Sequence, residues 1–355
     1  MLAESSGPAR AGRLMISTLR NEGAFILEWL AWHRMIGFTD FLIYSNDCED
    51  GSDAMLDRLA AMGIVQHRPN PRKGEKSIQW QALTRARDEA ATRAADWIMV
   101  ADIDEFLVIH AGAGRLDDLF AAVPAATAFA IDWRMFGSGG QERFTPGLVS
   151  AQFTRAAPDR LVWPWRAVQF KTLFRNHGLA RLGVHRPKFT AAARHCWHDG
   201  NGEAIPPPLG TVLTHARPRH GLAQINHYAL GSADDFLLKT TRGRPNRTDL
   251  PIGLDYWAER NFNTVEDRRL ADRAPELAAA VEGLLDDPAL ARLHAQAVEW
   301  RLAKIAALKA QPGPFHLYAT LLGLGSTQIL PMARQQELLR QLQDLIRRTR
   351  AGDDR

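Results

Sequence analysis

Apolar runs alternate with amphipathic stretches through the first 135 residues of the chain. The apolar runs predict strands at 14–19, 41–45, 64–68 and 97–101. The stretches between them have helical spacing and predict helices at 22–36, 52–62 and 76–95. A strand, helix, strand order with short connections is typical of a mostly parallel sheet with helices on both faces, so we expect an α/β fold.

Polar residues cluster directly after each of the four expected strands. Ligands of parallel sheets bind beyond the carboxyl ends of the strands, so these clusters are expected to form one site. They are Arg20-Asn21-Glu22, residues 46–51, residues 72–76, and Asp102 with Asp104 and Glu105.

The acidic cluster at the end of the fourth strand carries the clearest chemistry. Residues i and i+2 of an extended segment point to the same side, so Asp102 and Asp104 can present two carboxylates to one cation. Two such carboxylates repel each other, and a bound divalent ion offsets that repulsion. The alternative is a solvated acidic turn after a core strand.

The pattern loosens after residue 127 into short strands, turns and many aromatic residues, which we expect to be the irregular half of the same domain. Ser232 and Asp235 have the spacing of a helix N-terminal cap. Residues 266–310 and 332–349 have helical spacing. We therefore expect a flexible N-terminus at 1–12, a catalytic domain at 13–250 and a helical C-terminal extension at 251–355.

Charge and cysteine content narrow the class of protein. The net charge of +4 comes from 44 basic and 40 acidic residues that are interspersed, which suits an anionic small substrate and gives no nucleic-acid signature. The two cysteines, Cys48 and Cys196, predict neither a disulfide framework nor a thiolate zinc site. Without an apolar signal or spanning segment we expect a cytoplasmic enzyme, with peripheral contact at the inner membrane left open.

Several polar residues have both a binding and a structural interpretation. Asp47 and Asp50 can accept hydrogen bonds from a nucleoside or from their own turn. The cations Arg72, Lys73 and Lys76 can meet phosphate or simply be solvated.

The basic segment after residue 238 and two histidines raise the same question. Lys239 and Arg242 begin a run, continued by Arg244 and Arg247, that can hold a diphosphate or form a solvated helix face. His227 ends a short strand-like run and is preferred as a metal ligand, with His185 as its competitor.

Together these motifs resemble glycosyltransferases of the bacterial family 2 and family 92 type, which have the GT-A fold. The resemblance covers about residues 13–250. It rests on the ordered set Arg20-Asn21-Glu22, Glu28-Trp29, His33, residues 43–47, Asp50-Gly51-Ser52, residues 101–106, Trp133, Phe136-Gly137-Ser138, Lys171-Thr172, Phe174-Arg175, Asn226-His227-Tyr228, Phe236, Lys239 and Arg242-Gly243.

The resemblance implies sugar transfer from a nucleotide-sugar donor, with UDP expected, to a hydroxyl of a glycan or other acceptor. It implies Mn²⁺ or Mg²⁺ on Asp102, Asp104 and His227. Inversion is expected, with Asp132 or Glu142 as the catalytic base, although neither lies in a clear Glu-Asp motif of family 2. The donor-binding residues are expected to be Leu19, Asn21, Glu22, Asp47, Asp50, Lys76, Lys239 and Arg242.

Three other classes share part of this pattern. A phosphatase of the haloacid dehalogenase type places its Asp-x-Asp after the first strand, whereas here it follows the fourth. A nucleotidyltransferase has a glycine-rich signature where this chain has residues 17–22. A carbohydrate-binding protein could use the ten tryptophans as stacking platforms but needs no paired acids.

Overall fold

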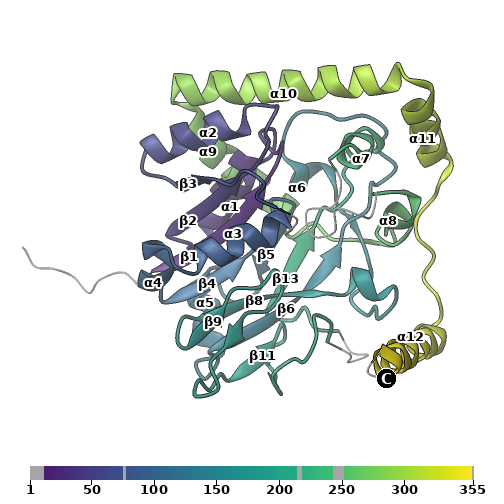
Figure 1. Cartoon of the computed structure of the whole chain (residues 1–355). Helices are drawn as coiled ribbons and strands as arrows, with labels where there is room; N and C mark the ends of the chain where they lie inside the picture. Colours follow the sequence, from purple (N-terminus) through teal and green to yellow (C-terminus); the bar gives the residue numbers. More distant parts are fainter. Residues whose placement is uncertain (1–11, 75–76, 214–217, 243–251, 354–355) are drawn as a thin grey trace, which may run out of the picture.

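The computed structural model describes residues 12–353 except 75–76, 214–217 and 243–251. Within these residues the chain forms a mixed α/β fold around a ten-stranded sheet (Figure 1). The sheet order along its main path is β12-β11-β6-β8-β4-β1-β2-β3. The N-terminus expected to be flexible lies almost wholly outside the described residues, and Lys76 lies outside them too.

The first half of the fold confirms the expected parallel arrangement. Strand β1 pairs in parallel with β2 and β4, and β2 pairs in parallel with β3. The elements are β1 (Arg13–Leu19), α1 (Ile26–Met35), β2 (Asp40–Ser45), α2 (Ser52–Ala61), β3 (Gln66–Pro69), α3 (Ile78–Ala86), α4 (Ala90–Ala94) and β4 (Trp97–Val100). All four expected strands are present, with bounds shifted by up to two residues.

The single long helix predicted for 76–95 was wrong, because the described part is two helices. Helix α3 ends at Ala86, and Glu89 has an extended backbone before α4 begins. The Glu89 carboxylate accepts two hydrogen bonds from the guanidinium of Arg68 on β3, both at 3.1 Å. The Thr92 hydroxyl donates to the Ala86 carbonyl at 2.6 Å, which satisfies one carbonyl at the broken end.

The second half of the chain also contributes central strands, so its description as irregular was wrong for these residues. Strand β8 (Phe170–Arg175) lies between β4 and β6 (Ala128–Met135) and is antiparallel to both. The other elements up to residue 227 are β5 (Glu105–Ile109), α5 (Leu116–Ala122), α6 (Val149–Gln152), β7 (Arg155–Ala156), η1 (Trp165–Ala167), β9 (Leu179–Arg181), β10 (Lys188–Phe189), β11 (Trp197–Asp199), β12 (Ala204–Ile205) and β13 (Ala223–His227).

The pairing of β5 with β13 brings distant sequence together at the carboxyl end of β4. The two strands are antiparallel, and the register places His227 opposite Glu105. The backbone N–H of Tyr228 donates to the carbonyl of Asp104 at 2.9 Å. A histidine more than a hundred residues after the acids is thereby held beside them.

Both faces of the sheet are covered by apolar side chains, as expected of a parallel sheet. Alternate residues of β1 belong to different clusters: Met15 packs with α1 on one face, while Leu14 and Ile16 pack with α3 on the other. These three side chains are fully buried. Burial on both faces leaves the strand ends as the place where polar groups meet solvent.

Helices dominate after β13, as the sequence predicts. These elements are α7 (Ala233–Thr240), α8 (Leu254–Ala258), β14 (Val265–Glu266), η2 (Ala271–Arg273), α9 (Ala274–Leu285), α10 (Pro288–Lys309), α11 (Pro312–Gly323) and α12 (Met332–Asp353). The expected cap of α7 is confirmed, since the hydroxyl of Ser232 accepts from the N–H of Asp235. Helix α11 was not predicted.

Helix α10 crosses the molecule along α2 and α7 (Figure 1). Its ion pairs include Arg301 with Asp235 and Lys309 with Asp234, both acids being on α7. The C-terminal helices therefore hold α7 against the rest of the fold. Among the described residues, no helix has the length and apolar content that crossing a bilayer requires.

Candidate active site

The backbone at the ends of β1 and β2 takes an unusual conformation. Asn21 has φ of 56° and Asp47 has φ of 46°, in the left-handed region that few residues other than glycine adopt. Asn and Asp tolerate it best, and such positions concentrate at functional sites. The side chain of Asn21 accepts from the backbone N–H of Glu49 at 2.8 Å, which joins the two strand ends.

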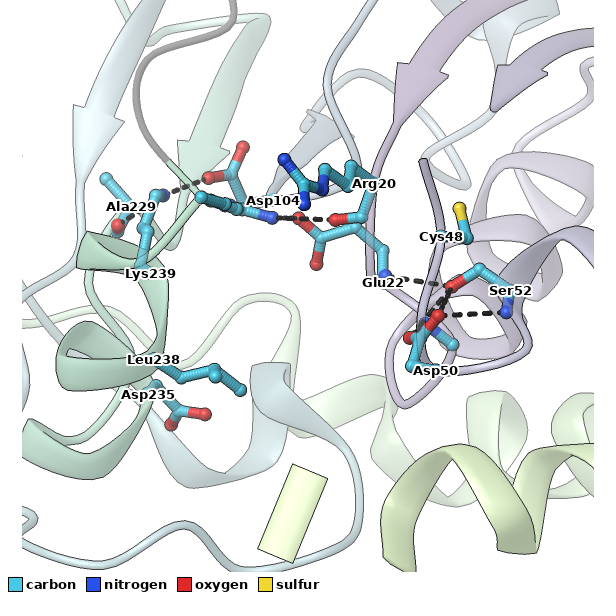
Figure 2. A network of polar contacts seen from close by, with 12 residues as sticks. Arg20, Glu22, Cys48, Asp50, Ser52, Asp104, Ala229, Asp235, Leu238 and Lys239 are labelled. Carbon is cyan, nitrogen blue, oxygen red and sulfur yellow. Dashed lines mark hydrogen bonds and ion pairs between the residues drawn. The ribbon is translucent and has the colours of Figure 1, made fainter. Parts of the chain in front are cut away.

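Asp50 belongs to a buried network that shapes this corner (Figure 2). Its carboxylate accepts from the backbone N–H of Gly23 at 2.9 Å and from the hydroxyl and N–H of Ser52. The Ser52 hydroxyl in turn accepts from the N–H of Glu22 at 3.0 Å. Helix α2 begins at Ser52, with Gly51 in the capping position.

The Asp-x-Asp segment is a turn, so the expectation of two carboxylates on one side of an extended strand was wrong. Strand β4 ends at Val100, and the N–H of Glu105 donates to the carbonyl of Asp102 at 3.1 Å. The turn sends the Asp102 and Asp104 side chains to different basic partners.

Asp104 is paired with a lysine and a histidine. The ammonium of Lys239 on α7 lies 2.8 Å from Asp104 Oδ2 and donates to the carbonyl of Ala229 at 2.6 Å (Figure 2). The Nε2 atom of His227 lies 3.5 Å from Asp104 Oδ1. Burial raises the pKa of Asp104, but the charge of Lys239 and the hydrogen bond with His227 outweigh it and hold that pKa well below its usual value.

Asp102 and Glu105 share a second lysine, Lys171. Its ammonium lies 3.1 Å from Asp102 Oδ2 and 3.0 Å from Glu105 Oε2, and the side chain is fully buried. Burial lowers the pKa of Lys171, but the two carboxylates more than reverse this and raise it. Burial also raises the pKa of Glu105 to about 8. Gln79 donates to Asp102 Oδ1 at 2.9 Å.

Both histidines singled out from the sequence pack on Trp133, but only His227 contacts Asp104. The ring centroid of Trp133 lies 4.3 Å from that of His227 and 5.2 Å from that of His185. His185 Nδ1 bonds to the carbonyl of Phe170 at 3.0 Å. Burial lowers the pKa of both histidines, that of His185 to about 3, so both are neutral at pH 7.

A cavity of about 70 Å³ opens beside Asp104. Its charged and polar lining residues include Asn21, Glu22, Asp104, Lys239 and Arg242. The guanidinium of Arg242 pairs with the Glu22 carboxylate and donates to the Arg20 carbonyl at 3.2 Å. Its apolar lining residues include Phe25, Phe106, Phe153 and Leu238. Five residues predicted from the sequence therefore meet at one opening.

The two acids expected as bases do not line this cavity. Asp132 is buried and ion-paired with Arg219, and both line a second cavity of about 20 Å³. Burial raises the pKa of Asp132 in spite of that guanidinium. Glu142 is exposed, and its carbonyl accepts from the N–H of Asp234 at the start of α7.

Other predicted residues are near the strand ends without lining the cavity. Leu19 is buried in the core, and Asp47 is exposed. Arg72 and Lys73 are exposed on the loop after β3. Lys171 belongs to the set that carries the family resemblance but was given no role, and a further signal is that it is a lysine within the apolar strand Phe170–Arg175.

The residues around Asp104 fit a divalent cation in part. Among the described residues, no group of three or more His, Cys, Asp or Glu side chains is arranged to hold a metal. The Asp104 and His227 atoms that face each other, 3.5 Å apart, are spaced as neighbouring ligands of one ion would be. A carboxylate and an imidazole suit Mn²⁺, and the remaining ligands would come from substrate and water.

The family model for glycosyltransferase family 92 matches residues 16–200, more than half of the chain. The chain belongs to glycosyltransferase family 92. The matched segment includes the end of β1, strands β2 to β4, Asp102, Asp104 and Lys171, and it ends before His227 and Lys239.

Curated proteins of family 92 match shorter parts. A family 92 protein of Ricinus communis is 31% identical over 101 residues, 28% of this chain and 17% of that protein. One of Oryza sativa subsp. japonica is 26% identical over 148 residues, 40% of this chain and 24% of that protein. The chain thus spans less than a quarter of these relatives.

Solved structures match only loosely. The structure of S. aureus TarS residues 1–349 in complex with UDP shares 13% identity with this chain at a TM-score of 0.27. The match covers 46% of each chain. A similarity this low adds nothing to the family assignment.

Proposed function

We propose that this family 92 member transfers a sugar from a nucleotide-sugar donor, with UDP as the expected nucleotide, to a hydroxyl of a glycan or other acceptor. The proposal takes the fold to be of the GT-A type. The observation that carries it is the meeting of Asp104, His227, Lys239 and Arg242 beside the ends of β1 and β4. That arrangement combines a cation site with cations for a leaving diphosphate.

The donor diphosphate binds beside Lys239 and Arg242 in this proposal. Lys239 and Arg242 come from the end of α7 and the residues directly after it, and both face the cavity. Their positive charges stabilise the negative charge that develops on the leaving nucleoside diphosphate. Burial lowers the pKa of each, but neighbouring carboxylates more than reverse this and raise both pKa values, so both groups are cationic at pH 7.

In this proposal Mn²⁺ or Mg²⁺ would be held by Asp104 and His227. When bound, the ion supplies Lewis-acid catalysis by neutralising charge on the departing diphosphate. Asp102 is held by Lys171 and Gln79, which orient its carboxylate. The nucleoside lies over the ends of β1 and β2, near Asn21 and Asp47, whose left-handed backbones present polar groups there.

Glu142 is the better of the two candidates for the catalytic base. It is exposed and follows the Gly137–Gly140 turn at the end of β6, whereas the Asp132 carboxylate is already paired with Arg219. An inverting transfer needs a carboxylate that can take the acceptor proton. An exposed side chain on a loop can approach an acceptor without first breaking an ion pair.

The Asp104→Asn variant tests the proposal. We expect calorimetry to show UDP binding to the parent protein with Mn²⁺ and little binding in EDTA. In the variant, donor hydrolysis or transfer should fall by about 100-fold or more, as when a charge-stabilising group is removed. The matched control is Asp53→Asn, an exposed acid on α2, which should behave like the parent.

Two results would contradict the proposal. Equal UDP affinity in EDTA and in Mn²⁺ would remove the metal from it. A parent protein that binds and hydrolyses no nucleotide sugar from a panel of UDP, GDP, CMP and dTDP donors would remove the transfer reaction itself.

A further inference from the structure

Lys239 neutralises Asp104 at the position where a cation would bind. Its ammonium is 2.8 Å from Oδ2 of the carboxylate, and the imidazole of His227 is 3.5 Å from Oδ1. The side chains of Lys239 and Asp104 are 13% and 22% exposed, so the pair lies at the edge of the cavity. The ammonium lies over the ring of Tyr256, 5.5 Å from its centroid.

The charges at this edge already balance. Asp104 is matched by Lys239, and Glu22 is matched by Arg242. A divalent ion added alone would leave two excess positive charges in a partly desolvated site. A diphosphate added alone would leave an excess of negative charge. Only the two together keep the site close to neutral, and interactions between charges are strong where water is largely excluded.

We propose that Lys239 is an exchangeable counter-ion, which holds Asp104 while the site is empty and moves to the donor diphosphate when a divalent cation takes its place. The inference rests on the proposed function and deepens it, because it states how metal and donor binding are coupled. Each ligand then increases affinity for the other by the same factor, as linkage requires.

Lys171 shows why the exchange is assigned to Lys239. Lys171 is fully buried and contacts two carboxylates, Asp102 and Glu105, so its release would leave two acids without their cation. Lys239 contacts one carboxylate and one backbone carbonyl, and it ends at the cavity. A flexible lysine side chain can move its charge between neighbouring acceptors without moving the helix.

The test measures binding of Mn²⁺ alone, UDP alone and UDP with saturating Mn²⁺ by calorimetry. In Lys239→Met we expect Mn²⁺ alone to bind about tenfold more tightly than to the parent, because its competitor for Asp104 is gone. UDP should bind about tenfold more weakly with Mn²⁺ present, because a phosphate-binding cation is gone. The two affinities thus change in opposite directions.

Two further variants separate exchange from general loss of charge. Arg242→Met should weaken UDP binding and leave the affinity for Mn²⁺ alone nearly unchanged, because Arg242 pairs with Glu22 rather than with Asp104. Lys304→Met removes a half-buried lysine of α10 that pairs with Glu49, and it should match the parent in every titration. Lys239→Gln is measured beside Lys239→Met, so that if one of the two variants fails to fold, the other can still be titrated.

The outcomes distinguish this inference from the proposed function. If the parent binds UDP only with Mn²⁺, while Lys239→Met and Lys239→Gln bind Mn²⁺ alone no more tightly than the parent, exchange is wrong and the proposed function stands. If the parent binds neither UDP nor Mn²⁺, both are wrong. Tighter Mn²⁺ binding in Arg242→Met as well would show that net charge alone accounts for the effect.

Discussion

Asp104 and Asp132 are both acids paired with a basic side chain, yet their surroundings differ. The Asp132 carboxylate and the Arg219 guanidinium are 4% and 5% exposed, whereas the Asp104 and Lys239 side chains are 22% and 13% exposed. Arginine offers a planar fork that fits one carboxylate, while lysine offers a mobile point charge. The first pair is suited to holding strands and loops together, and the second to exchanging partners.

The surroundings of Asp132 reinforce the difference. Arg219 also donates to the carbonyl of Leu213 at 2.9 Å, and nearby Arg134 is paired with Asp159 and Asp267. The adjoining cavity, about 20 Å³, has room for a water molecule rather than a substrate. The Asp104–Lys239 pair, which lines the larger of the two cavities, is therefore the better candidate for a reactive site.

The largest expected effect comes from breaking the Asp132–Arg219 pair. Arg219→Met should lower the free energy of unfolding by about 3–5 kcal/mol at pH 7, because it leaves the Asp132 carboxylate buried without a cation. The folded-state pKa of Asp132 is raised by burial and would rise further, so this loss should grow as pH increases from about 4 and be smaller at pH 5 than at pH 7.

Urea unfolding at both pH values measures the effect of Arg219→Met. The matched variant from the Asp104–Lys239 pair is Lys239→Met. Lys239→Met should cost less stability, because water can reach Asp104. If Lys239→Met and Arg219→Met lowered the free energy of unfolding equally, the proposed difference between the two pairs would be wrong.

A second prediction concerns the two histidines on Trp133. His227→Ala should raise the Mn²⁺ concentration needed for half-maximal donor binding by about 10-fold to 100-fold, as the loss of a group at a metal site typically does. His185→Ala removes a ring from the same tryptophan without touching Asp104, so the Mn²⁺ requirement should stay unchanged. If His185→Ala raised the required Mn²⁺ concentration and His227→Ala did not, His185 rather than His227 would be the metal ligand.

The smallest expected effect concerns Asp159, which lies near the Asp132–Arg219 pair. His220 and Arg134 together hold the pKa of Asp159 down to about 2. A lowered carboxylate pKa contributes stability above its unfolded value near 4, and this contribution is lost as pH falls toward 2. The Asp159 side chain is 48% exposed, so the contribution should be below about 1 kcal/mol.

Unfolding of the parent and Asp159→Asn at pH 3 and pH 5 measures that contribution. The difference between the two proteins should be larger at pH 5. A larger difference at pH 3 would reverse the sign and refute the assignment.

Much of the first half of the fold could be predicted because its signals are local. The apolar run at 97–101 indicates β4, and the acids directly after it indicate a polar strand end. The Ser232 and Asp235 spacing indicates the start of α7 for the same reason, since a cap forms within one turn. The shape of the Asp-x-Asp segment was missed because a tight turn and a strand end look alike in composition.

Strands β1 to β4, the acids after β4 and the capped helix α7 follow from local patterns, because hydrophobic spacing and capping act over a few residues. Long-range packing sets which lysine each acid contacts: β8 places Lys171 against Asp102, and β13 places His227 beside Asp104. It also places Arg219 against Asp132. These contacts join residues far apart in the chain, and they depend on strand register and pairing order, which no local pattern contains.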